Sequence, residues 1–208
     1  MLHGSRFLTR KKLDNTESRS RGVINNGPLI SAIVAITLAI SGYIVAWYQG
    51  IVTEQYKARL ARVDMQLREF YGPLFSRTES ENRAFIEFSA STRPGHKYFW
   101  DEVSPPTTKQ QILWRRWIES VSMPNYLAME EIIQKKADLI EDNDIPQPLL
   151  DLSAHIAGYK YVVASWHAGD TDRQFSFLPF PQNARDHLRL RYMQLKKEQA
   201  ELMTKVFR

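Results

Sequence analysis

Three side chains in the second half of the sequence have residue types and a spacing that could do chemistry. Asp151, His155 and Tyr159 follow one another at intervals of four residues, so in a helix each lies next to the following one on one face. An Asp–His pair can orient an imidazole for acid–base chemistry, or supply two ligands to a metal ion. The structural alternative is a buried histidine whose ring is satisfied by a carboxylate or a loop carbonyl. We treat the three residues as a candidate ligand-binding site and keep that alternative open.

Signatures of the common metal, nucleotide and hydrolase sites are missing from the sequence. It has no cysteine, which excludes thiolate metal ligands, disulfides and cysteine nucleophiles. It has no Glu-x-x-His pair, which helical di-metal proteins repeat on several helices. The sequence also lacks the phosphate-binding loop of nucleotide hydrolases, the glycine motif of dinucleotide-binding folds and the Gly-x-Ser-x-Gly motif of serine hydrolases. We therefore predict no metal ion and no cofactor, and we assign no catalytic residue.

A second candidate site is an aromatic stripe beside two arginines. Trp114, Arg115 and Trp117 are of the types that dominate protein–protein interfaces, so they form a candidate partner-binding surface. Their helical spacing also fits ordinary core packing with solvated arginines between the rings. Both interpretations remain open at this point.

The positive charge of the chain is concentrated at its N-terminus. Residues 1–28 hold six Lys and Arg against two acids, which leaves 22 cations and 21 anions in the remainder. A nucleic-acid-binding domain needs an excess of clustered cations, so we predict no nucleic-acid partner. A basic, flexible tail suits anionic lipid or a targeting signal instead.

The elements that would carry these residues begin with a membrane segment. Residues 29–52 contain no charged side chain, and Trp47 and Tyr48 lie near the C-terminal end, where aromatic rings favour the membrane interface. About 20 apolar helical residues span the roughly 30 Å hydrocarbon layer. A cleaved signal peptide would have a shorter apolar region followed by a small-residue cleavage site. We therefore predict a single-pass transmembrane helix in contact with the lipid bilayer.

The side of the membrane is not decided by charge. Residues 9–28 hold five cations and the first turns after the segment hold four, which is close to a tie under the positive-inside rule. A bacterial inner membrane is our first expectation. The Arg-rich, acid-poor tail also fits an import signal, so the mitochondrial inner membrane is the alternative.

Beyond the membrane, residues 53–73 predict an amphipathic stalk with coiled-coil spacing. Apolar side chains recur there in steps of four and three, at Tyr56, Leu60, Val63, Leu67, Phe70 and Leu74. Gly72-Pro73, and Met123-Pro124 further along the chain, are expected to break or kink their helices, because proline removes a hydrogen-bond donor.

Residues 74–208 predict an all-α domain, an antiparallel bundle of about four to five helices. Prolines and turn residues place loops at 91–106 and 170–182, and Thr107 or Thr108 is the expected N-cap of the helix that follows the first loop. The second loop carries several large apolar residues, which we expect to pack back on the helices as a clasp.

A set of short motifs runs in a distinctive order from about residue 60 to residue 203. They are Leu67-Arg-Glu-Phe-Tyr71-Gly-Pro-Leu74, Arg93-Pro-Gly95, Pro105-Pro-Thr107, Trp114-x-x-Trp117, Met123-Pro-Asn125, Asp151-Leu-Ser-Ala-His155-x-x-x-Tyr159, Trp166 and Leu195-Lys-Lys-Glu-Gln199. Together they resemble a family of uncharacterised single-pass membrane-anchored helical proteins of bacteria and some eukaryotes. One departure is the missing Leu that the family has between the Pro and Asn of the Met-Pro motif. The resemblance implies the architecture and no activity.

Three functions follow as hypotheses. The first is a membrane-anchored interaction module, scaffold or accessory subunit, with a protein partner or a second copy of the chain, and it requires an exposed apolar patch. The second is a small-ligand sensor or enzyme built around His155, which requires a cavity shared with another helix, through Glu119 or Glu130. The third is a homodimeric spacer that pairs through the stalk.

Overall fold

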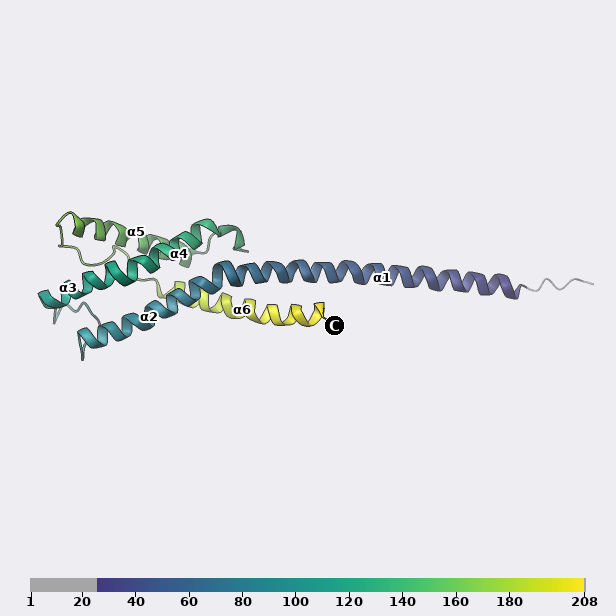
Figure 1. Ribbon diagram of the computed structural model, residues 1–208, viewed down its shortest axis with the longest axis horizontal. Coiled ribbons are helices and arrows are strands. Elements are labelled where there is room, and N and C mark those ends of the chain that lie inside the picture. Colours follow the sequence, from purple (N-terminus) through teal and green to yellow (C-terminus); the bar gives the residue numbers. More distant parts are fainter. Residues whose placement is uncertain (1–25, 208) are drawn as a thin grey trace, which may run out of the picture. The chain divides into compact units, whose positions relative to one another are not determined.

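Every regular element in residues 26–207, the part of the chain that the computed structural model describes, is a helix (Figure 1). The helices are α1 (Gly27–Gln66), α2 (Gly72–Thr92), α3 (Thr108–Trp117), α4 (Met123–Lys135), α5 (Gln147–His167) and α6 (Gln182–Val206), with a 3-10 turn at Ala137–Leu139. The predicted all-α class is confirmed for these residues. The predicted flexible tail, residues 1–28, lies almost wholly outside them.

The chain divides into two compact units, residues 1–48 and 49–208. The described part of the first unit is the apolar beginning of α1, and its side chains are all exposed. This stretch is long and apolar enough to cross a membrane. Such exposure of consecutive large apolar side chains is costly in water.

Two prolines that were expected to break or kink helices are instead accommodated by π-helical turns. The turns Leu67–Tyr71 and Ile118–Ser122 join α1 to α2 and α3 to α4, and Pro73 and Pro124 follow directly in the first turn of the next helix. The amide of Gly72 donates to the carbonyl of Leu67, five residues back. A widened turn shifts the hydrogen-bond register, so a proline without an N–H group can be inserted while the helix continues.

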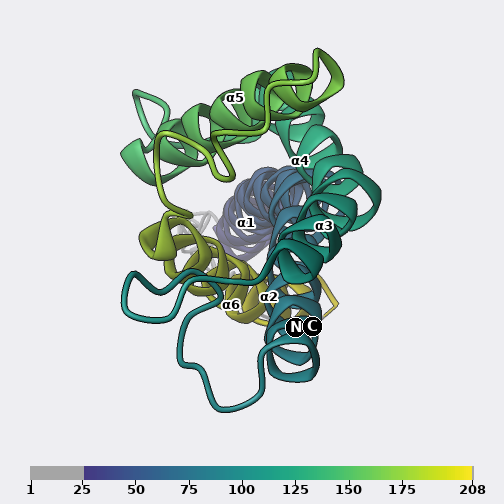
Figure 2. The same cartoon turned by 90° about the vertical axis from the view of Figure 1, so that its left-hand side faces the viewer.

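The second unit is built around one apolar core. α2 packs against α6 and α4, and α5 packs against α4 and α6 (Figures 1 and 2). Fully buried side chains at the centre are Val63, Phe70, Leu74, Met129, Leu149, Leu152, Ile156 and Leu188. Each helix contributes residues at spacings of three and four, because this spacing places them on the face that is turned away from water.

Local signals in the sequence explain several helix ends. Thr107 is the N-cap of α3, and its hydroxyl and the side chain of Gln110 form a reciprocal capping box, which confirms the predicted cap. Gly169 ends α5 with a φ of 89°, a left-handed conformation that glycine adopts without a Cβ clash. α4 ends at Lys135, and the 3-10 turn that follows places Leu139 in the core.

Two loops complete the second unit and bring aromatic rings to the helices. In the loop after α2, the buried Arg93 donates to the carbonyls of Phe99 and Ser104, and Phe99 is itself buried. The loop between α5 and α6 packs on α5 through Ser176, which is 5 % exposed. The expected clasp is therefore only partly buried, because Phe175 and Phe177 remain about half exposed.

Candidate functional site

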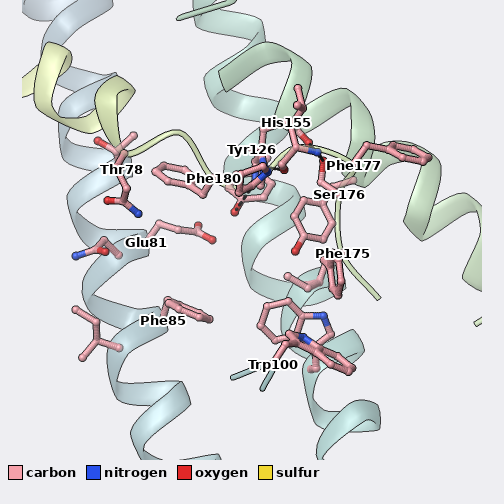
Figure 3. Close-up of a pocket in the computed structure, with 18 residues that line it drawn as sticks. Thr78, Glu81, Phe85, Trp100, Tyr126, His155, Phe175, Ser176, Phe177 and Phe180 are labelled. Carbon is pink, nitrogen blue, oxygen red and sulfur yellow. Dashed lines mark hydrogen bonds between the residues drawn. The ribbon is translucent and has the colours of Figure 1, made fainter. Parts of the chain in front are cut away.

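A pocket of about 530 Å³ lies between α2, α3, α4, α5 and the two loops (Figure 3). Its lining is dominated by rings and apolar side chains: Phe85, Ile86, Trp100, Trp114, Ile118, Tyr126, Tyr159, Phe175, Phe177, Leu178, Pro179 and Phe180. The polar lining residues are Thr78, Glu81, Asn82, His155, Ser176 and Gln182. A concave, mostly apolar cavity of this size with a few polar groups is typical of small-molecule sites.

His155 sits on α5 in the wall of this pocket and is 3 % exposed. Its Nδ1–H donates to the carbonyl of Leu178 at 2.7 Å, and its Nε2 faces the hydroxyl of Tyr126 at 3.4 Å. Because a carbonyl can only accept, Nδ1 carries the hydrogen and Nε2 presents a lone pair. Burial lowers the pKa of His155, although hydrogen bonds to backbone carbonyls oppose the shift, so the ring is neutral near pH 7.

Three aromatic rings surround the imidazole. The ring centroids of Tyr126, Tyr159 and Phe180 lie 5.4, 5.1 and 5.5 Å from that of His155, all in edge-to-face geometry. Such packing favours a single ring orientation. The imidazole is thereby held in one orientation in the wall of the pocket.

Glu81 on α2 supplies the only charged side chain among the described residues that line the pocket. Burial raises the pKa of Tyr126 and of Tyr159, and the negative charge of Glu81 raises both further. Both phenols are therefore protonated donors at neutral pH. Glu81 is half-buried, and its Oε2 accepts a hydrogen bond of 2.8 Å from the side-chain amide of Asn125.

Asp151, the first residue of the predicted triplet, lies outside the pocket. Its carboxylate accepts hydrogen bonds from Gln147 at 2.8 Å and from Asn183 at 3.4 Å, at the start of α6. It thus ties α5 to α6, and of the triplet only His155 and Tyr159 line the cavity. Residues at intervals of four lie close together on a helix, but each residue turns the helix by 100°. Over the eight residues from Asp151 to Tyr159 the direction of the side chain therefore rotates by about 80°, and the first and last residues do not face the same space.

The glutamates suggested from sequence as partners of His155 are engaged elsewhere. Glu119 lies 3.3 Å from the exposed His167, and Glu130 forms an ion pair of 3.0 Å with Lys160. The carboxylate in the pocket is Glu81, from a helix far away in the sequence. No periodic signal singled it out, because α2 carries several glutamates and only the packing of α2 against α4 selects the inward one.

The candidate partner-binding residues are largely used inside the domain. Trp114 is 6 % exposed and donates its Nε1–H to the carbonyl of Gln174 at 2.7 Å, while Arg115 reaches the side chain of Gln174 at 3.2 Å. Trp117 stacks on Phe88 with ring centroids 4.5 Å apart. These contacts favour core packing, and Trp114 also forms part of the pocket wall.

The arrangement is suited to binding. Within residues 26–207, no three His, Asp or Glu side chains come together as a metal site requires. The pocket offers aromatic faces, the hydroxyls of Tyr126 and Tyr159 and the carboxylate of Glu81, while the Nε2 lone pair of His155 faces the Tyr126 hydroxyl. Comparisons with protein families, curated proteins and solved structures find no match to this chain.

Proposed function

We propose that this chain is a single-pass membrane protein whose helical bundle domain binds a small, largely apolar ligand in the pocket around His155. The observation that carries the proposal is the aromatic pocket of about 530 Å³, which is partly open to solvent and lined on several sides by rings. Ligand sites in proteins are concave, mostly apolar and largely formed before the ligand binds. A cavity of this size that is kept open between rigid helices therefore supports a ligand site over a packing defect.

Rigid positioning of the walls supports the same function. His155 is held by the Leu178 carbonyl, and Trp114 by that of Gln174, so both the helices and the loop are fixed by hydrogen bonds. A binding site formed before the ligand arrives loses less conformational entropy on binding. A sensor fits these features better than an enzyme, because the pocket shows no activated nucleophile.

The membrane anchor is part of the proposal. Residues 29–52 are uncharged and helical, and we propose that they span the bilayer and tether the bundle, with the bacterial inner membrane favoured over the mitochondrial one. Extraction of membranes with alkaline carbonate provides the test. An anchored chain stays in the membrane pellet, whereas release into the supernatant would contradict the anchor.

Binding is tested with the full chain in nanodiscs, by saturation-transfer NMR with 2-phenylethanol as a neutral aromatic probe. The blocking variant is Asn82→Phe, which places a ring in the pocket lining from α2. The matched control is Arg83→Phe, the next residue on the same helix, which is exposed and outside the lining. We expect probe signal in the wild type and in the control and loss of signal in Asn82→Phe. Equal signal in all three, or none in the wild type, would overturn the proposal.

A second candidate, an interaction module, is supported by one exposed aromatic pair. Tyr161 and Phe177 are 59 % and 57 % exposed, and their ring centroids are 5.4 Å apart. Exposed aromatic residues are enriched at protein interfaces. Affinity purification of the full chain with the Tyr161→Ser/Phe177→Ser variant tests this, since a genuine stoichiometric partner is lost only from the variant.

The apolar stripe of the predicted stalk, residues 53–73, gives less support to a homodimeric spacer. Val63 is 0 % exposed and Leu67 is 9 % exposed, because both pack into the core of the second unit. Side chains already buried within the chain have little apolar area left to offer to a second copy.

A further inference from the structure

The pocket combines many aromatic faces with a single carboxylate. Eight of its lining residues are Phe, Tyr or Trp, and Glu81 is the single charged one among the described lining residues. His155 is neutral, and no Lys or Arg belongs to the lining. The interior is therefore negative in charge and rich in π faces, which carry negative potential themselves.

The carboxylate of Glu81 is directed into this space. Figure 3 shows it extending from α2 toward the rings of Phe180 and Phe175, above Phe85. The negative charge of Glu81 raises the pKa of Tyr126 and of Tyr159, which line the same pocket. The carboxylate is therefore close enough to act electrostatically across the pocket. Four helices and both loops thus line the pocket that holds this one carboxylate.

Arg77, which lies one turn before Glu81 on α2, is hydrogen-bonded to a neutral side chain and forms no ion pair with Glu81. It donates to Asn125 Oδ1 at 3.0 Å, and Asn125 in turn donates to Glu81. Among residues 26–207, no cationic side chain forms an ion pair with Glu81. The half-buried carboxylate therefore has the neutral amide of Asn125 as its side-chain partner, and a bound cation would give it an opposite charge.

Building on the proposed function, we infer that the ligand is an organic cation, an amine or quaternary ammonium on an apolar body, whose charge lies between Glu81 and the aromatic rings. The rings attract a cation by their π faces, and the carboxylate supplies the opposite charge. The apolar body of the ligand lies beside Trp114 and Ile118, two buried side chains of the lining. An anionic ligand of the same shape is excluded by the same two features.

The test compares three probes of one shape on the full chain in nanodiscs by isothermal titration calorimetry. They are the cation 2-phenylethylammonium, the neutral 2-phenylethanol and the anion 3-phenylpropionate. We expect the cation to bind about tenfold more tightly than the alcohol, and the anion to show no binding, since cation–π and carboxylate attraction together supply roughly that factor.

The variant Glu81→Gln keeps the shape and removes the charge, and Glu87→Gln on the exposed face of α2 is its matched control. Glu81→Gln should bind cation and alcohol equally, with alcohol affinity within about twofold of the wild type, and Glu87→Gln should behave as the wild type. Cation preference that survives in Glu81→Gln, or is absent in the wild type, overturns the inference. In that case, alcohol binding that Asn82→Phe abolishes leaves the proposed function standing, whereas no binding of any probe refutes both.

Discussion

Gly158 on α5 and Ser176 in the following loop lie in direct contact, and a Cβ atom at position 158 would overlap the Ser176 hydroxyl. That hydroxyl donates to the carbonyl of His155 at 3.0 Å and accepts weakly from the amide of Leu178 at 3.4 Å. The glycine thus lets the loop approach the helix closely enough to place the Leu178 carbonyl on His155. One small residue therefore sets the position of the pocket wall.

The first prediction is that Gly158→Ala destabilises the domain. Alanine is the better helix former by about 1 kcal/mol, so an isolated helix would gain stability. Here the clash with Ser176 should dominate and lower the free energy of unfolding by about 1–3 kcal/mol, as overpacking does. Urea unfolding of the full chain in detergent, followed by circular dichroism, gives the value. Partial rescue by the additional change Ser176→Gly is expected, and a net gain in stability of Gly158→Ala would refute the close approach.

A second prediction compares two tryptophans. Trp114→Phe removes the Nε1–H that donates to the buried carbonyl of Gln174, and should cost about 1–3 kcal/mol because that carbonyl loses its partner. Trp117→Phe removes a buried Nε1–H that has no hydrogen-bond partner among the described residues, so it should cost clearly less. Thermal unfolding of both variants measures the difference. Equal losses would show that the Gln174 bond is not what stabilises the loop.

The third prediction concerns the π-helical turn before Pro73. A Cβ at Gly72 would overlap the carbonyl oxygen of Leu67, the acceptor of the widened turn. Gly72→Ala should therefore lower the free energy of unfolding by about 1–3 kcal/mol, whereas the exposed Ser76→Ala on α2 should stay within about 0.5 kcal/mol of the wild type. Denaturant titration of the two variants and the wild type measures the difference in the free energy of unfolding. An unchanged free energy of unfolding in Gly72→Ala would mean that the π-helical turn does not require glycine at this position.

The fourth prediction is a loss of stability in mild acid. The pKa of His155 in the folded domain is lowered from about 6.5 by burial, so the unfolded chain binds more protons in the interval just below pH 6.5. The stabilising effect of the neutral ring is complete above pH 6.5 and is lost as the pH falls toward the lowered folded pKa. His187 shifts in the same direction through burial and Arg191.

Chemical unfolding between pH 7.5 and 5 measures this dependence. His155→Gln should reduce the slope in that window, and His155→Gln/His187→Gln should nearly abolish it. The carboxylates with lowered pKa, such as Glu141, affect stability only at lower pH, so they do not mask the effect. An unchanged slope in His155→Gln would mean that the buried ring is not the group that titrates.

Local features were predictable from the sequence because they depend on neighbours within a turn or two. The Thr107 cap and the end of α5 at Gly169 follow from side-chain capping and from the left-handed conformation of glycine. The prolines at 73 and 124 were recognised as disturbances, but a widened turn that lets a helix continue depends on packing at both sides. The apolar stretch in residues 29–52 is likewise a property of composition alone.

The sequence by itself determined the helical class, the apolar N-terminal helix and the face on which His155 and Tyr159 lie, because these depend on composition and on the 3.6-residue period. Only the tertiary structure decided that Glu81 shares a cavity with them and that Asp151 does not. The physical reason is that periodicity assigns a residue to a face of its own helix. Which carboxylate meets which ring depends on how α2, α4 and α5 pack against one another, and side chains far apart in the sequence decide that packing.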